Sequence, residues 1–71
     1  QLHRPEREAV IVDVEVLARK GDGYVYDAAY SNPLHSGTEV TILETRRDWI
    51  RIRTPDKNEG WIPLSAAERV L

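Results

Sequence analysis

Seventy-one residues make one domain at most, and a chain of this length buries only ~60% of the surface that it exposes when unfolded. The absence of cysteine excludes disulfides and thiolate metal sites, and the formal net charge of −2 argues against a general nucleic-acid binder. No apolar run approaches the ~18 residues of a membrane span, and nothing resembles a signal peptide. Because the chain starts at Gln1 rather than at methionine, we expect it to be a segment of a longer protein.

The N-terminal part contains a polar tail and the first predicted strand. Residues 1–8 are mainly polar and are predicted to form a disordered linker, which leaves residues 9–71 as the domain. Residues 9–17 alternate in the manner of a β-strand. Four valines fall on one face of this strand, and we expect that face to pack on a core. They are Val10, Val12, Val14 and Val16.

A long connection follows at residues 20–37, where glycine, asparagine and proline favour turns. Loops of this length in small domains are usually functional or held by their own aromatic side chains. All three tyrosines, Tyr24, Tyr26 and Tyr30, lie in it. Each ring could tuck under the loop, or one of the first two could form the second wall of a groove against Trp49.

Residues 38–44 and 48–53 alternate apolar and polar side chains and predict two neighbouring antiparallel strands. A tight turn between them would pair Glu44 with Asp48. The same register places glutamate opposite arginine further along the strands, which is a favourable pair. A slip of one residue would bury arginines and expose isoleucines.

The last part of the chain predicts two more short strands. One points Ile62 inward, opposite Ile52, and points Trp61 and Pro63 outward. A Ser-x-x-Glu capping box at Ser65 then predicts one helical or 3₁₀ turn before the final strand. No helix-length apolar period occurs. The sequence therefore predicts a small all-β barrel of five strands, with a long loop after the first strand and a 3₁₀ turn before the last.

No arrangement of residues indicates catalysis or a bound metal. His3 and His35 are isolated, and no carboxylate cluster has the spacing of a calcium loop. A serine nucleophile would need a nearby base, whereas His35 and Ser36 are adjacent in an extended segment and point apart. We expect no enzyme activity, no metal and no cofactor.

The outward aromatic side chains are the positive evidence for binding. Trp49 and Arg51 share one face of a strand, and Trp61 and Pro63 lie on the same face of the next. Either the tryptophans close the end of the barrel and the arginines shield them, or they form an interface, where tryptophan is enriched. The candidate ligand-binding residues are Tyr24, Tyr26, Trp49, Arg51, Trp61 and Pro63.

The charges are unevenly distributed along the chain. Residues 1–45 carry four basic and eight acidic side chains, whereas residues 46–71 carry six basic and four acidic ones. The second part could present a basic strip to an anionic partner. Ordinary surface charge paired across strands is the simpler interpretation, and we favour it.

Three short motifs together resemble one known family. They are the Gly-Thr-x-Val run at residues 37–40, the strand led by Trp49, and Gly-Trp-Ile at residues 60–62. In this order and spacing they resemble the bacterial SH3 domain (SH3b, SH3 type 3) over residues 10–70. The resemblance implies an SH3-like five-stranded barrel. It also implies a non-catalytic module attached to a larger envelope protein or cell-wall enzyme, where it docks peptide or peptidoglycan.

The eukaryotic SH3 relatives allow a comparison of single residues. Trp49 resembles the tryptophan that walls their proline-peptide groove, and Trp61 and Pro63 resemble the aromatic residue and the proline of its floor. The tyrosine that those domains have three residues later is Ala66 here, and their Ala-Leu-Tyr-Asp-Tyr segment is absent. We therefore do not expect polyproline recognition in the eukaryotic manner.

Residues 61–70 are also similar to the C-terminal SH3 domain of tetratricopeptide-repeat proteins of the aerotolerance-operon (Bat) group. This narrower resemblance implies an interaction module of a membrane-associated assembly in the bacterial cell envelope. The leading hypothesis is a monomeric protein- or peptide-binding module. The alternative is a cell-wall module for peptidoglycan peptide. A nucleic-acid-binding barrel is the least favoured hypothesis, because acidic side chains outnumber basic ones in residues 1–45.

Overall fold

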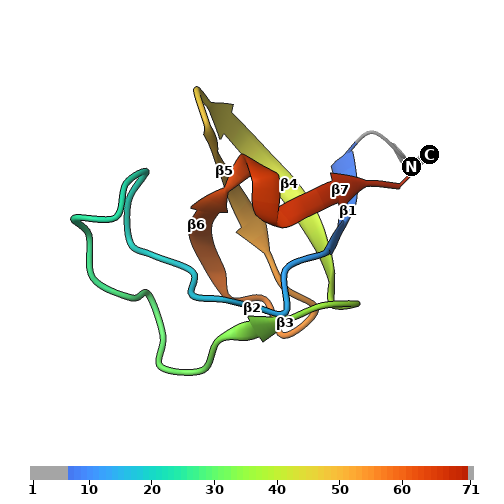
Figure 1. The fold of residues 1–71 in the computed structure, drawn as a ribbon, viewed down its shortest axis with the longest axis horizontal. Coiled ribbons are helices and arrows are strands. Elements are labelled where there is room, and N and C mark those ends of the chain that lie inside the picture. Colours follow the sequence, from blue (N-terminus) through green and yellow to red (C-terminus); the bar gives the residue numbers. More distant parts are fainter. Residues whose placement is uncertain (1–6, 71) are drawn as a thin grey trace.

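The computed structural model describes residues 7–70, which form a small barrel of short strands with one long projecting loop (Figure 1). The strands are β1 (Glu8–Ile11), β2 (Glu15–Val16), β3 (Leu34–His35), β4 (Glu39–Arg46), β5 (Trp49–Arg53), β6 (Glu59–Pro63) and β7 (Ala67–Arg69), with a 3₁₀ helix at Leu64–Ala66. The predicted linker falls mostly on residues 1–6, which lie outside the described residues. Its last residue, Glu8, already belongs to β1.

The larger sheet has five antiparallel strands in the order β6-β5-β4-β1-β7, and β2 and β3 form a second, two-stranded sheet. The loop of residues 17–33 leaves β2 and returns to β3, and it projects from the side of the barrel opposite β1 and β7 (Figure 1). The predicted small all-β fold, with a long loop and a 3₁₀ turn before the last strand, is confirmed.

The core lies between the strands and consists mainly of branched aliphatic side chains. Its largest fully buried members are Ile11, Ile50, Ile52 and Ile62. Three of these were predicted to point inward from the alternation within β5 and β6. Since each fully buried isoleucine contributes roughly 1.5–3 kcal/mol relative to its exposed form, these four supply much of the driving force for folding.

The predicted valine face of the first strand is wrong except at Val16, which packs against the core. Ala9 and Ile11 are buried, each 1% exposed, whereas Val14 is 83% exposed. The strand ends after Ile11, because the amides of Val12 and Asp13 turn to donate to the carbonyl oxygen of Ala66. The alternation therefore does not continue as one strand, and the apolar side chains of the other face enter the core.

The predicted β4–β5 register is wrong, by three residues beside the turn and by two residues beyond a bulge. The β4–β5 turn contains only Arg47 and Asp48, so Arg46 pairs with Trp49, and a bulge lies between Ile42 and Glu44. Arg47 adopts a φ of 55°, which this tight turn requires. Beyond the bulge, where Ile42 pairs with Ile52, the shift is two residues, and a shift of two leaves each side chain on its predicted face. The inward isoleucines were therefore predicted correctly although the register was not.

The register of β5 and β6 is also shifted by two residues from the predicted one. Ile62 pairs with Ile50 rather than with Ile52, and Gly60 lies opposite Ile52. The 3₁₀ helix forms as predicted, but Pro63 occupies its N-cap position and no side chain caps it, so the expected capping box is not made. The helix is held instead by the packing of Ala66, which is fully buried.

Tyr30 packs against the core with its hydroxyl group buried and without a hydrogen-bond partner among the described residues. Burial raises the pKa of this phenol. Because an unpaired buried hydroxyl carries a desolvation cost, Tyr30→Phe is expected to leave the free energy of unfolding unchanged or to raise it by up to about 1 kcal/mol. Urea denaturation measures this, with Tyr26→Phe as the control on an exposed ring. A loss of stability at Tyr30 alone would contradict the assignment.

Candidate functional site

The long loop brings Tyr24 onto the tryptophan that begins β5. The ring centroids of Tyr24 and Trp49 are 4.9 Å apart, and the ring planes meet at 72° in an edge-to-face arrangement. Pro63, the last residue of β6, is the strand partner of Trp49. One apolar surface is therefore formed by Trp49 of β5, Pro63 of β6 and Tyr24 of the loop, which are far apart in the sequence.

This surface is hollowed. One cavity is lined by Tyr24, Asp48, Trp49, Pro63, Leu64 and Ser65. A second cavity shares Tyr24 and Pro63 with the first. It continues toward β2 along Asp13, Glu15, Val16, Leu17, Arg19 and Pro33. We call the two cavities together the aromatic groove. Tyr24 is 70% exposed and Leu64 40%, so the groove offers accessible apolar side chains to a ligand.

Arg19 attaches the base of the loop to the barrel. Its backbone pairs with that of Trp61 through two hydrogen bonds of 2.8 Å. Its guanidinium donates to the carbonyl oxygens of Tyr26, at 2.9 Å, and Tyr24, at 3.3 Å, and lies 5.3 Å from the centre of the Tyr24 ring. Arg19 thus holds the loop at Tyr24 and Tyr26. No motif or spacing in the sequence identified this role of Arg19.

Trp61 lies on the outer face of β6 but does not line the groove. Only 7% of it is exposed, and the guanidinium of Arg46 lies 4.9 Å from the centre of its ring. Its strand partner is Arg51, not Arg53 as the predicted register implied. The sequence left open whether the tryptophans are shielded by arginines or form an interface, and at Trp61 the structure shows the indole covered by Arg46.

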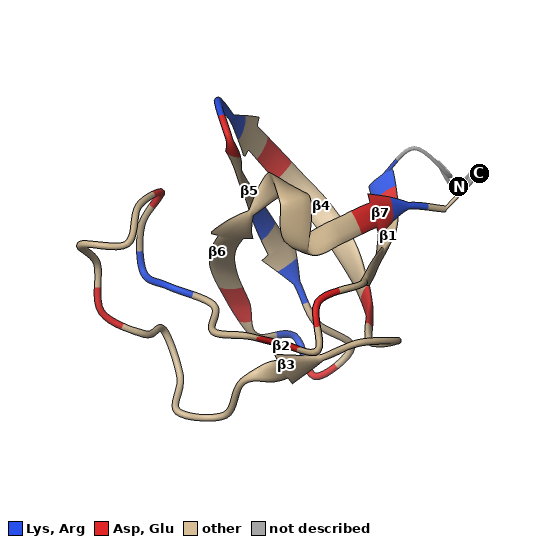
Figure 2. Cartoon of the chain, viewed as in Figure 1, with Lys and Arg blue, Asp and Glu red and all other residues tan. Residues whose placement is uncertain are grey.

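The arginines of the outer face are paired with carboxylates. Arg51 contacts Glu44 at 3.3 Å and Glu59 at 2.9 Å, and Arg53 contacts Glu59 at 3.4 Å. Arg46 contacts Glu44 at 2.7 Å. Acidic and basic residues consequently lie beside one another over β4, β5 and β6 (Figure 2), which fits paired surface charge rather than a basic strip.

The hydrogen bond from Arg46 holds the pKa of the Glu44 carboxyl below its usual range, with a smaller contribution from Arg51. The pair with Glu44 likewise raises the pKa of Arg46. These groups are fully charged at neutral pH. Arg51 is engaged by two carboxylates and is absent from the lining of the groove, so the structure does not join it to Trp49 and Pro63 in one pocket.

Residues 34–68 match the bacterial SH3 domain family. The matched segment runs from β3 into β7 and contains Trp49 and Pro63, but it begins after the loop that supplies Tyr24. The bacterial SH3 domain is typically a protein- or cell-wall-binding module and is generally non-catalytic. No curated protein matches the sequence.

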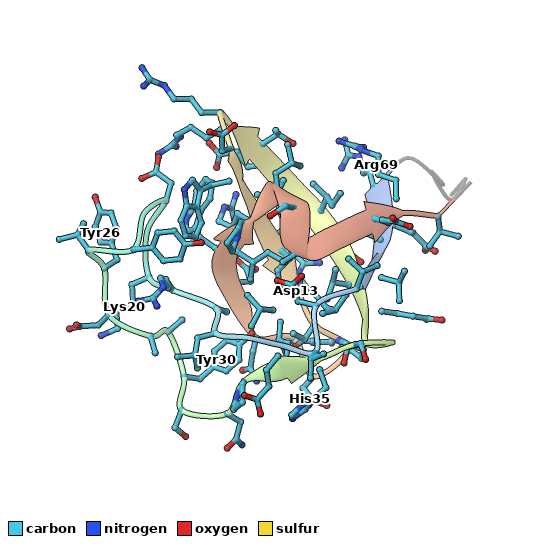
Figure 3. All side chains as sticks on the ribbon, in the orientation of Figure 1. Asp13, Lys20, Tyr26, Tyr30, His35 and Arg69 are labelled. Atoms are coloured by element: carbon cyan, nitrogen blue, oxygen red, sulfur yellow. The ribbon has the colours of Figure 1, made fainter. Side chains whose placement is uncertain are left out.

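Two further positions distinguish the structure from the expected groove. Ala66, which replaces an expected tyrosine, is fully buried, and Leu64 and Ser65 line the groove beside it. Tyr26 lies at the outer end of the loop (Figure 3). Its ring occupies the space beside Gly21, where a Cβ atom would approach it to 2.6 Å, so Tyr26 braces the loop and does not line the groove.

The described residues contain no group of three or more histidine and acidic side chains that could hold a metal ion. Within residues 7–70, no helix is long and apolar enough to cross a membrane. The groove offers apolar and aromatic contacts, and its lining also includes three carboxylates, Asp13, Glu15 and Asp48, and the guanidinium of Arg19.

Proposed function

We propose that this domain is a protein- or peptide-binding module that holds its ligand in the aromatic groove. The observation that carries the proposal is the edge-to-face contact of Tyr24 with Trp49 beside Pro63, because it creates an exposed, ordered aromatic wall on a groove. Aromatic side chains bury a large area on binding with little loss of conformational entropy, and they dominate the energetics of many interfaces. The typical role of the matched family supports the same class of function.

Trp49→Ala tests this proposal. Peptides are first selected from a displayed library against the wild-type domain, and the dissociation constant of a selected peptide is then measured for each variant by calorimetry. Loss of a central aromatic contact is expected to weaken binding by about 30-fold or more. Circular dichroism and Tm should show a folded domain, because Trp49 is only partly buried and outside the core cluster.

Val25→Ala is the matched control, since Val25 is 89% exposed in the same loop and outside the groove lining. It should bind the peptide like the wild type. A Trp49→Ala variant that binds as tightly as the Val25→Ala control would rule out the aromatic groove as the ligand site.

A cell-wall ligand, a peptidoglycan peptide, is the second candidate, and the family's typical role favours it. Purified murein sacculi provide the test: a wall-binding domain sediments with them at moderate salt, and Trp49→Ala does not. A wild-type domain that stays in the supernatant would exclude this candidate. Nucleic acid is not proposed, because carboxylates pair with Arg46, Arg51 and Arg53.

The proposal extends to the context of the domain. We infer a monomeric module of a larger bacterial protein associated with the cell envelope, and the similarity of residues 61–70 to the aerotolerance-group proteins supports a tetratricopeptide-repeat parent. The flanking gene sequence tests this. Helical repeats and a membrane span upstream would support it, whereas an adjoining hydrolase domain would point to wall targeting.

A further inference from the structure

An ion pair links the outer part of the long loop to the barrel. Asp22 lies in the loop, and its carboxylate is 3.4 Å from the guanidinium of Arg46 on β4. Twenty-four residues separate the two in sequence. In Figure 3 the loop carrying Lys20 and Tyr26 stands away from the core, so contacts such as this one decide how its tip lies against the sheet.

Arg46 makes this contact from a fixed position. Its guanidinium lies over the indole of Trp61, 4.9 Å from the ring centre, and it is bonded to Glu44 at 2.7 Å. An isolated surface ion pair contributes little, because two long side chains must be ordered to form it. Here a buried indole and a neighbouring carboxylate already order the arginine, so little further entropy is lost when Asp22 binds.

Tyr24 follows Asp22 by two residues, and its position depends on where the loop tip lies. Tyr24 is 70% exposed, its ring contacts Trp49 edge to face, and the Arg19 guanidinium lies 5.3 Å from the ring centre. No core packing holds it. A contact that holds Asp22 near the sheet therefore acts together with Arg19 to hold Tyr24 against Trp49.

We propose that Arg46 is a positioning residue for the aromatic groove: by binding Asp22 it holds the loop tip so that Tyr24 forms the wall against Trp49. The inference rests on the proposed function for its consequence in binding, but its structural part does not need a ligand. Because the Arg46 side chain is 53% exposed, salt screens the contact with Asp22. Ligand affinity should consequently fall with ionic strength even for an uncharged peptide.

The test separates the structural part from the binding part. Proton NMR of the free domain measures the cross-peaks between the Tyr24 and Trp49 rings in Asp22→Asn, Arg46→Gln and the double variant. Each single change is expected to weaken these cross-peaks, and the double variant to add little, because both remove the same contact. Asp22→Asn leaves Arg46 over Trp61 and keeps the test valid if Arg46→Gln unfolds.

Two matched controls accompany these variants. Arg53→Gln removes an arginine from the same charged face, and Asp27→Asn removes a carboxylate from the same loop. Within residues 7–70, neither Arg53 nor Asp27 forms an ion pair with Asp22 or Arg46. Both should retain the ring contact. Unchanged ring cross-peaks in Asp22→Asn, equal to those of Asp27→Asn, would overturn the proposal.

Binding of a library-selected, uncharged peptide is then measured in the same variants. Asp22→Asn and Arg46→Gln are expected to bind roughly threefold to thirtyfold more weakly, whereas the controls bind like the wild type. If the ring contact is lost and the affinity is unchanged, Arg46 positions the loop as proposed, and it is the proposed groove function that fails.

Discussion

Replacing Ile62 with alanine is expected to remove much of the stability of this domain. Ile62 is fully buried in the middle of the core, opposite Ile50 on the neighbouring strand. Isoleucine-to-alanine changes at such sites cost about 2–5 kcal/mol, because the lost transfer free energy is joined by the cost of the cavity. A domain of 71 residues has a total stability of roughly 4–10 kcal/mol, so the variant is expected to be largely unfolded or close to it.

The cavity cannot close easily, since the side chains around it belong to paired strands of a barrel and cannot move independently. Urea denaturation followed by circular dichroism measures the change. Val14→Ala is the matched control, because Val14 is 83% exposed, and it should stay within about 0.5 kcal/mol of the wild type. A loss below about 1 kcal/mol at Ile62 would show that the core is looser than the packing indicates.

The inward positions of β5 and β6 could be predicted because alternation has a period of two and isoleucine alternates there with arginine or tryptophan. The same rule failed for β1, where both faces are apolar and the strand is too short to include all four valines. Register was missed because the β4–β5 turn uses Arg47 at positive φ, without the Asn-Gly or Asp-Gly pair that usually marks such a turn.

The site was predictable only where it follows from strand faces. Trp49 and Pro63 were expected on one face and are strand partners. A tyrosine was expected to lie against Trp49, and Tyr24 makes that contact. The roles of Arg19 and Arg46 were missed, because they come from the closure of a long loop onto the sheet. No local periodicity encodes such a contact.

Gly60→Val is expected to detach that loop from the barrel. A Cβ atom at Gly60 would lie 2.7 Å from the Cβ of Ala18 and 3.4 Å from the carbonyl oxygen of Arg19. Neither atom is the end of a flexible side chain, and Ala18 is fully buried, so only a backbone shift can relieve the contact. Overpacking of this kind costs about 1–3 kcal/mol, and the two further methyl groups of valine should bring the loss to the upper end of that range.

The shift would act on function as well as on stability. Residues on both sides of the loop pack over Gly60, and the adjacent backbone pair of Arg19 and Trp61 anchors the loop base. Moving that pair displaces Tyr24, which lies beside the Arg19 guanidinium, from Trp49. Gly60→Val should therefore lose both the ring cross-peaks and peptide affinity, with a smaller effect in Gly60→Ala.

Gly23→Ala provides the matched control, because a Cβ atom there would meet nothing closer than 3.9 Å. It should change the free energy of unfolding by less than about 1 kcal/mol and keep the ring contact. If Gly60→Val proved as stable as Gly23→Ala, the loop would not be packed against β6 as described. The packing of Ala18 on Gly60 would then not fix the loop against the barrel, and the position of Tyr24 would depend on Arg19 and Arg46 alone.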